Sequence, residues 1–93
     1  VPAGTPVQGM EGSSFARSIL DNFDWLDVDA ARREMRDAAL QLVRENPEVG
    51  VIIMECTNMV PYAQEVARAT ERPVFSIYTY LRWFHAGLAP RRF

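Results

Sequence analysis

Three neighbouring residues, Cys56, Thr57 and Asn58, have side chains that could do chemistry together. A thiolate can act as a nucleophile or a proton-transfer base, and a hydroxyl and an amide beside it can donate hydrogen bonds to a carboxylate. From the residues alone, two interpretations of Cys56 stay open. It is either a reactive thiol or a small buried hydrophobic residue, which is a common role for free cysteine.

The position of Cys56 favours the chemical interpretation. It follows an apolar run at residues 49–54, rich in β-branched residues, which predicts a strand buried on both faces. Ligands of open α/β sheets bind beyond the carboxyl ends of the strands. A helix is expected from Pro61 to about Thr70, and its N-terminus would stabilise a thiolate or a substrate carboxylate. Thr57 or Asn58 could instead cap that helix, so both roles stay open for them.

Four other residues are weaker candidates. Gly9 and Glu11 close a possible first strand at residues 6–10, and parallel strands would bring them to the same sheet edge as Cys56. Strand alternation points Glu55 away from Cys56, so a structural hydrogen bond is the expected role of Glu55. His85 stands near the end of the last predicted helix, where a cation is favoured without any catalytic role.

The elements that must position these residues alternate between helix and strand. The clearest is a helix at residues 27–46, whose buried stripe at helical spacing comprises Met35, Ala38, Ala39, Leu42 and Val43. A short helix is expected from Ser13 or Ser14 to Phe23, a second buried strand at residues 73–78, and a last helix at residues 80–87 capped by Thr79. This order predicts an α/β fold with a parallel sheet and flanking helices, forming one small domain over residues 1–93.

Composition excludes several kinds of chemistry for this chain. It has no lysine, which a pyridoxal-phosphate Schiff base and a phosphate-binding P-loop both require. One cysteine and one histidine cannot make the usual four-ligand zinc site of thiolates and imidazoles. We therefore expect neither a cofactor nor a metal.

The charge and hydropathy patterns make an ordinary soluble protein the expectation. The net charge is −2 and the charges are mixed along the chain, so neither nucleic acid nor a membrane surface is an expected partner. The longest strongly apolar run is too short to span a bilayer, and the first residues lack the features of a secretory signal. A cytoplasmic location is the resulting default expectation.

The chain resembles the C-terminal part of the Asp/Glu/hydantoin racemase superfamily. The resemblance is strongest at VGVIIMECTNM, residues 49–59, and the PYA that follows at residues 61–63, which match the second cysteine motif of that superfamily. The stretch RPVFSIYT at residues 72–79 is similar to the strand and turn that come next there. The GME at residues 9–11 and the helix at residues 27–46 fit in order and spacing, so the resemblance covers nearly the whole chain.

This resemblance implies a two-lobe α/β fold, of which the chain would be an incomplete lobe. It also implies a cofactor-independent isomerase in which one thiol from each lobe acts on opposite faces of the substrate. By motif, Cys56 would be one acid/base thiol. Thr57 and Asn58 would hold the carboxylate of a small carboxylate or amino-acid-like substrate.

Two departures from the family pattern matter. Many relatives carry His or Glu at the position of Asn58, whose amide cannot shuttle protons. The chain also has a single cysteine, so one copy cannot form a two-thiol site, and the isolated chain is expected to be inactive as a racemase. Two alternatives stay open: a single-cysteine decarboxylase resembling arylmalonate decarboxylase, and a non-enzymatic α/β interaction domain in which Cys56 is core.

The last helix predicts self-association or a larger assembly. It carries a heavy apolar load for a surface helix, namely Tyr80, Leu81, Trp83, Phe84 and Leu88. Large exposed apolar patches mark interfaces, and unpaired strand edges invite pairing with another chain. A dimer, or association with a missing N-terminal part, is therefore expected through residues 79–88 or a sheet edge.

Overall fold

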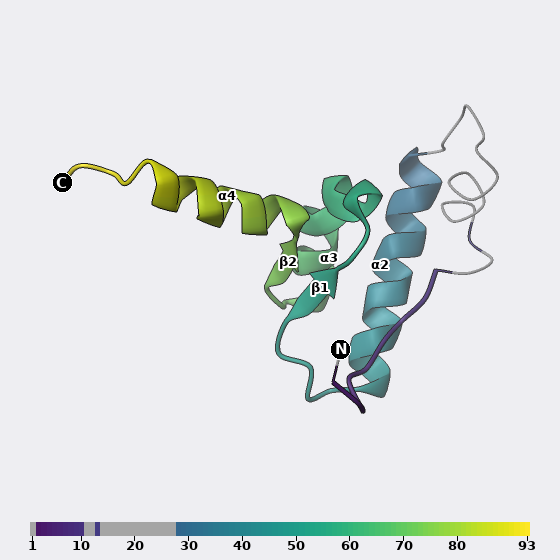
Figure 1. Cartoon of the computed structure of the whole chain (residues 1–93). Helices are drawn as coiled ribbons and strands as arrows, with labels where there is room; N and C mark the ends of the chain where they lie inside the picture. Colours follow the sequence, from purple (N-terminus) through teal and green to yellow (C-terminus); the bar gives the residue numbers. More distant parts are fainter. Residues whose placement is uncertain (1, 11–12, 14–27) are drawn as a thin grey trace.

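A computed structural model describes residues 2–10, 13 and 28–93, which form a mixed helix–strand fold (Figure 1). The described elements are compatible with an α/β class, and they comprise a two-stranded parallel sheet, one 3-10 helix and three α-helices. In chain order they are α2 (Val28–Glu45), β1 (Ile52–Met54), η1 (Thr57–Tyr62), α3 (Ala63–Thr70), β2 (Val74–Ser76) and α4 (Ile77–Leu88). The short helix predicted to end at Phe23 lies, apart from Ser13, outside the described residues.

The long helix predicted at residues 27–46 is confirmed as α2. Its stripe is buried at Ala31, Met35 and Ala39, and partly buried at Ala38, Leu42 and Val43. Beyond its end, the backbone N–H and the side-chain amide of Asn46 both donate to the carbonyl of Leu42 at 3.0 Å. This local hydrogen bonding closes the helix just before Pro47, because the residue ahead of a proline disfavours helical angles. Neither α2 nor any other described helix has the length and apolar character needed to cross a membrane.

The two buried strands are present but shorter than predicted. β1 and β2 have three residues each and run parallel, with Ile52 opposite Val74 and Ile53 opposite Phe75. One hydrogen bond extends the pairing at its start, from the N–H of Ile52 to the carbonyl of Pro73 at 2.9 Å. The apolar residues before β1 therefore approach the sheet without joining its ladder.

The prediction of a first strand at residues 6–10 is wrong. Among the described residues the sheet has two strands, and residues 5–10 are irregular chain. Figure 1 shows this segment running beside α2 in roughly the direction of β1. A cavity lies between this segment and the edge of β1, and residues of both line it. In addition, Pro6 has no backbone N–H to donate to the hydrogen-bond ladder of a sheet.

Among the residues that the structure describes, the sheet is covered on one face only, which corrects the prediction of strands buried on both faces. Ile52 and Met54 point into the core, where they pack with the buried residues of α2, η1 and α3: Ala31, Met35, Ala39, Tyr62 and Val66. Ile53 and Phe75, paired on the opposite face, are 69% and 49% exposed. Alternate side chains of a strand point to opposite faces, and among the described residues nothing covers the second face.

α4 begins three residues earlier than predicted, so Ile77 and Tyr78 are helical and not part of a strand. Ser76 is the N-cap, which corrects the prediction of Thr79 in that role. The Thr79 hydroxyl accepts a hydrogen bond from the Ser76 N–H and donates one to the Ser76 carbonyl, both at 2.9 Å. A residue three positions into a helix that bonds back to the N-cap backbone stabilises the helix start. No residue of α4 is buried, and the helix projects from the rest of the fold (Figure 1).

Candidate functional site

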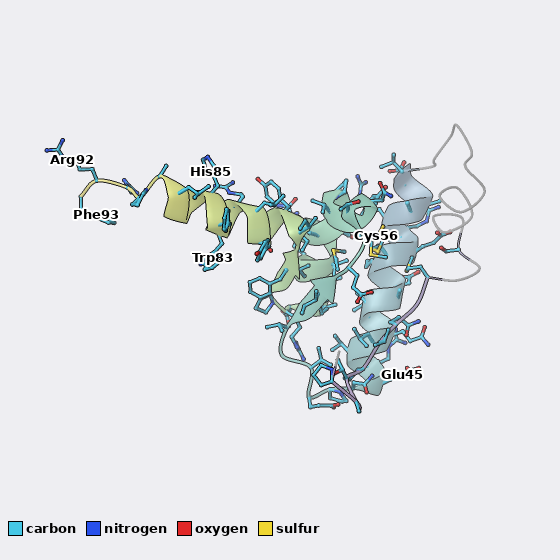
Figure 2. The ribbon with its side chains drawn as sticks, in the orientation of Figure 1. Glu45, Cys56, Trp83, His85, Arg92 and Phe93 are labelled. Atoms are coloured by element: carbon cyan, nitrogen blue, oxygen red, sulfur yellow. The ribbon has the colours of Figure 1, made fainter. Side chains whose placement is uncertain are left out.

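Cys56 lies where the chain leaves β1 and enters η1 (Figure 2). Its backbone is extended, with φ of −86° and ψ of 133°, and it forms the N-cap of η1. The thiol is partly buried, and the side chain makes no capping hydrogen bond. Cys56 therefore stands between a strand end and a helix start, partly open to solvent, as its place in the sequence predicts.

The helix after Cys56 differs from the predicted one. η1 spans Thr57–Tyr62 with Pro61 inside it, and the α-helix begins only at Ala63. The N–H of Met59 donates to the carbonyl of Cys56 at 3.0 Å, which is the hydrogen-bond spacing of a 3-10 turn. The N-terminus of α3 is thus separated from the thiol by η1. The prediction that an α-helix starting at Pro61 stabilises the thiolate is therefore not met, because a short 3-10 helix follows Cys56 instead.

Thr57 and Asn58 are the first two residues of η1, and both are exposed. The N-caps of η1 and α3 are Cys56 and Tyr62, so the capping alternative for Thr57 and Asn58 is wrong. The hydroxyl and the amide stand open to solvent directly after the thiol. A hydroxyl and an amide can each donate a hydrogen bond to an anion.

The other predicted candidates do not gather with these three. Gly9 is exposed in the segment before the first gap, and Glu11 lies outside the described residues. Glu55 is exposed beside Cys56, and His85 is exposed on the projecting helix α4, away from Cys56 in Figure 2. In the part of the chain that the structure describes, no three His, Cys, Asp or Glu side chains come together as a metal site would require.

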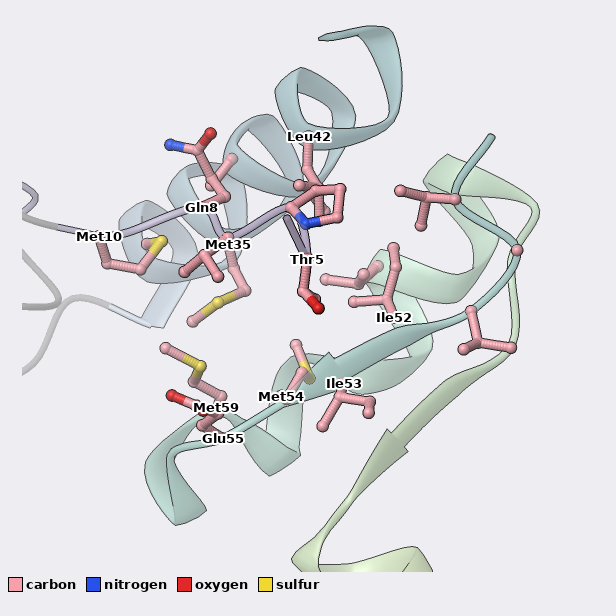
Figure 3. A pocket seen from close by; sticks show the side chains of 18 of the residues that line it. Thr5, Gln8, Met10, Met35, Leu42, Ile52, Ile53, Met54, Glu55 and Met59 are labelled. Atoms are coloured by element: carbon pink, nitrogen blue, oxygen red, sulfur yellow. The ribbon is translucent and has the colours of Figure 1, made fainter. Parts of the chain in front are cut away.

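A cavity of about 550 Å³ lies between α2, β1 and residues 5–10 (Figure 3). Its lining includes all four methionines of the chain, Met10, Met35, Met54 and Met59, each from a different segment. Sequence reasoning placed Met35 and Met54 in core positions but missed the cavity. Flexible thioethers fill irregular apolar space, so methionines from separate segments were the available signal.

The cavity lining includes residues close to Cys56 in the sequence but not Cys56 itself. Glu55 and Met59 are part of the lining and lie together at one end in Figure 3, whereas Cys56 between them in sequence is not part of it. The volume falls within the ~300–1,000 Å³ typical of small-molecule pockets. Residues 55–59 therefore contribute both to the lining of an apolar cavity, through Glu55 and Met59, and to an exposed turn that carries the partly exposed thiol.

No protein-family model matches this chain, and no solved structure matches it significantly. Over 62 residues the chain is 31% identical to a dimethylsulfoniopropionate lyase from Durusdinium sp. clade D. The aligned part is 67% of this chain and 21% of the relative. The chain thus spans about a fifth of the length of the curated relative that it matches.

Proposed function

We propose that this chain is part of a cofactor-independent, racemase-like isomerase in which Cys56 is one of two acid/base thiols. The observation that carries this proposal is the placement of Cys56, partly exposed at the carboxyl end of β1 with Thr57 and Asn58 directly after it. In the proposed fold, this chain is an incomplete lobe of a two-lobe enzyme.

The proposed chemistry is proton transfer at the carbon next to a carboxylate. The Cys56 thiolate removes the proton, and the negative charge that develops is shared with the carboxylate. Hydrogen bonds from Thr57 and Asn58 to the carboxylate oxygens stabilise that charge as it forms. Inversion requires a second acid on the opposite face, and because this chain has one cysteine, another segment or chain must supply it.

The comparison favours a second candidate, a lyase. Dimethylsulfoniopropionate, named as the substrate of the similar protein, has a carboxylate with a dimethylsulfonium group one carbon beyond the α-carbon. Loss of the α-proton to the Cys56 thiolate would move that electron pair into a carbon–carbon double bond. The carbon–sulfur bond would break, releasing dimethyl sulfide and leaving acrylate. This elimination begins with the same step as racemisation but needs no second acid.

Alkylation of Cys56 tests the step that both candidates share. Iodoacetamide, followed by mass spectrometry, is expected to modify Cys56 in the folded chain, because the thiol is partly exposed. Succinate should slow the reaction and uncharged succinamide should not. Asn58→Ala should weaken the succinate effect while leaving the basal alkylation rate similar. An inert thiol, or equal rates with both additives, would contradict the proposal and favour an interaction domain with Cys56 in the core.

Product analysis distinguishes the two candidates. In D₂O, the isolated chain is expected not to invert aspartate, glutamate or a hydantoin, because only one thiol is present. Deuterium exchange with retention would agree with this, since one thiolate can remove and return a proton on one face. Inversion with deuterium at the α-carbon would refute the two-thiol requirement. Release of dimethyl sulfide from dimethylsulfoniopropionate, abolished in Cys56→Ser, would establish the lyase instead.

A further inference from the structure

Two neighbouring parts of the described structure expose large apolar residues without a partner. One is the C-terminal arm, residues 77–93, which comprises α4 and the tail after it. The other is the open sheet face, formed by Val51, Ile53 and Phe75, each at least 49% exposed. Figure 1 shows the arm leaving the top of the sheet and extending away from it. Together they hold eleven of the thirteen large apolar residues that are exposed in the described structure, and such a concentration marks an interaction surface.

The arm is built to pack against something. Ile77, Leu81, Phe84 and Leu88 follow each other at spacings of four, three and four residues, which places them on one stripe of α4. Trp83, next to this stripe, is 72% exposed and its ring lies 6.1 Å from that of Tyr80. An apolar stripe of this kind normally faces a core, yet α4 has no buried residue.

The arm cannot cover its own sheet. Ile77, the first residue of α4, follows Ser76, the last residue of β2, without a connecting loop. A helix folds back over its strand through a connection of ~2–6 residues, and the Ser76–Thr79 hydrogen bonds hold the helix start where it is.

Charge indicates what covers the arm. It contains three arginines and no acidic residue, whereas the rest of the chain holds seven arginines and all twelve acidic residues. A hydrogen bond to Tyr78 raises the pKa of Arg82, and an arginine side chain is protonated at any working pH. The net charge of the arm is therefore opposite in sign to that of the rest of the chain, which favours a contact between the arm of one copy and the body of another.

We propose that two copies of this chain form a two-fold dimer in which α4 of each copy lies across the open sheet face of the other. Each chain presents both complementary surfaces, so one reciprocal contact would cover both at once. It would also supply the second helix layer that parallel sheets require. The proposal does not depend on the chemistry proposed for Cys56.

Disulfide cross-linking tests this arrangement directly. Two chains are prepared with Cys56→Ser, one also carrying Ile53→Cys and the other Phe84→Cys, and the mixture is oxidised with copper phenanthroline. The proposed contact predicts a cross-linked heterodimer on non-reducing gels. A matched pair with Arg33→Cys, on the exposed side of α2, in place of Ile53→Cys should give ~10-fold less product.

Light scattering with size-exclusion chromatography gives the second readout, on chains whose folding is checked by circular dichroism. The unmodified chain should have the mass of a dimer. Arg82→Glu should raise the dimer dissociation constant ~10-fold, whereas Arg33→Glu, the same charge change on α2, should not. A chain that stays monomeric at its highest soluble concentration and gives no cross-link would overturn the proposal, leaving the surface to a different protein segment. A dimer that cross-links equally through Arg33→Cys would overturn it as well.

Discussion

α2 and α4 are both helices with an apolar stripe, but within the described part of the chain α2 buries residues of its stripe and α4 buries none. In α2, Ala31 and Met35 are almost fully buried against β1 and α3, whereas in α4 even Phe84 is 50% exposed. The stripe decides that a helix forms and which side is apolar. Whether the stripe is buried depends on whether another element of the chain packs against it. α4 follows β2 without a loop and therefore points away from the sheet.

The same contrast divides the sheet, and the candidate site lies at the boundary. Ile52 and Met54 belong to the packed side, while Ile53 between them belongs to the open side. Cys56 comes two residues after Met54, where the packed core gives way to the exposed start of η1. A rigid strand therefore holds the thiol in place, while the adjacent donors stay accessible.

The strongest test of this contrast is the same substitution on both sides. Tyr62→Ala removes a ring that is 4% exposed in the core, and it should lower the free energy of unfolding by ~3–5 kcal/mol. Tyr80→Ala removes a ring of α4 that is 56% exposed, and it should change the free energy by no more than ~0.5 kcal/mol. Urea unfolding provides the measurement, at concentrations too low for self-association. Similar losses for both variants would mean that α4 is packed within its own chain.

The second prediction concerns the polar link that holds the packed side together. Arg72 donates from Nε to the carbonyl of Val49 at 2.8 Å and from Nη1 to the carbonyl of Thr70 at 2.9 Å. It therefore ties the approach to β1 to the end of α3. Hydrogen bonds from a charged donor are worth ~1.5–3 kcal/mol, and Arg72→Ala should cost about that much in urea unfolding. Arg68→Ala, on the exposed side of α3, is the control and should be nearly neutral. An Arg72→Ala variant with an unchanged free energy of unfolding would show that these hydrogen bonds do not stabilise the sheet.

Local patterns predicted the packed part of the fold well. The stripe around Met35 gave α2 almost to the residue, because helical periodicity is set by local geometry. The end of β2 was missed because Ile77 and Tyr78 look like strand residues. The hydrogen bonds of Thr79 to Ser76 made them helical, and the spacing of these two hydroxyl residues was the overlooked signal.

Long-range features were the ones that the sequence could not supply. The place of Cys56 follows from a strand and a turn close to it in the chain, so it could be predicted. The cavity exists because residues 5–10 lie at some distance from β1 and α2, and no local sequence pattern predicts how far apart such segments lie. The sheet is covered on one face because α4 follows Ser76 directly and does not fold back over the strands. The apolar run at residues 49–54 indicates burial on both faces and gives no sign of this.

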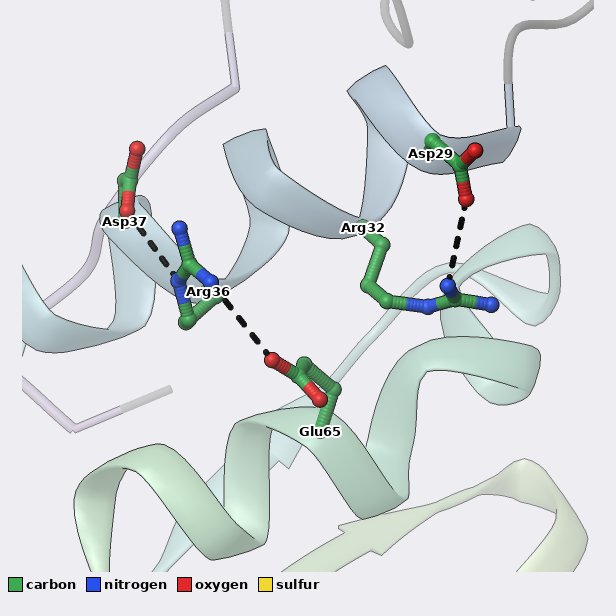
Figure 4. Close-up of polar contacts among 5 residues, drawn as sticks. All are labelled: Asp29, Arg32, Arg36, Asp37 and Glu65. Atoms are coloured by element: carbon green, nitrogen blue, oxygen red, sulfur yellow. Dashed lines mark hydrogen bonds and ion pairs between the residues drawn. The ribbon is translucent and has the colours of Figure 1, made fainter.

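The smallest predicted effect comes from the ion pair that joins α2 to α3 on the packed side. Arg36 Nη1 lies 3.7 Å from Glu65 Oε1, and Arg36 Nε lies 3.4 Å from Asp37 Oδ1 (Figure 4). The side chains of Arg36 and Glu65 are 37% and 33% exposed, so water screens much of their attraction. A double-mutant cycle with Arg36→Met and Glu65→Gln should give a coupling energy of ~0.2–1 kcal/mol. The coupling should shrink in high salt, because ions screen partly exposed charges.

Arg32 and Asp29, 3.2 Å apart within α2, provide the control, since their cycle probes one helix and not the contact between two. A coupling between Arg36 and Glu65 well above this range would mean that charge, and not the apolar stripe of α2, holds the packed side together.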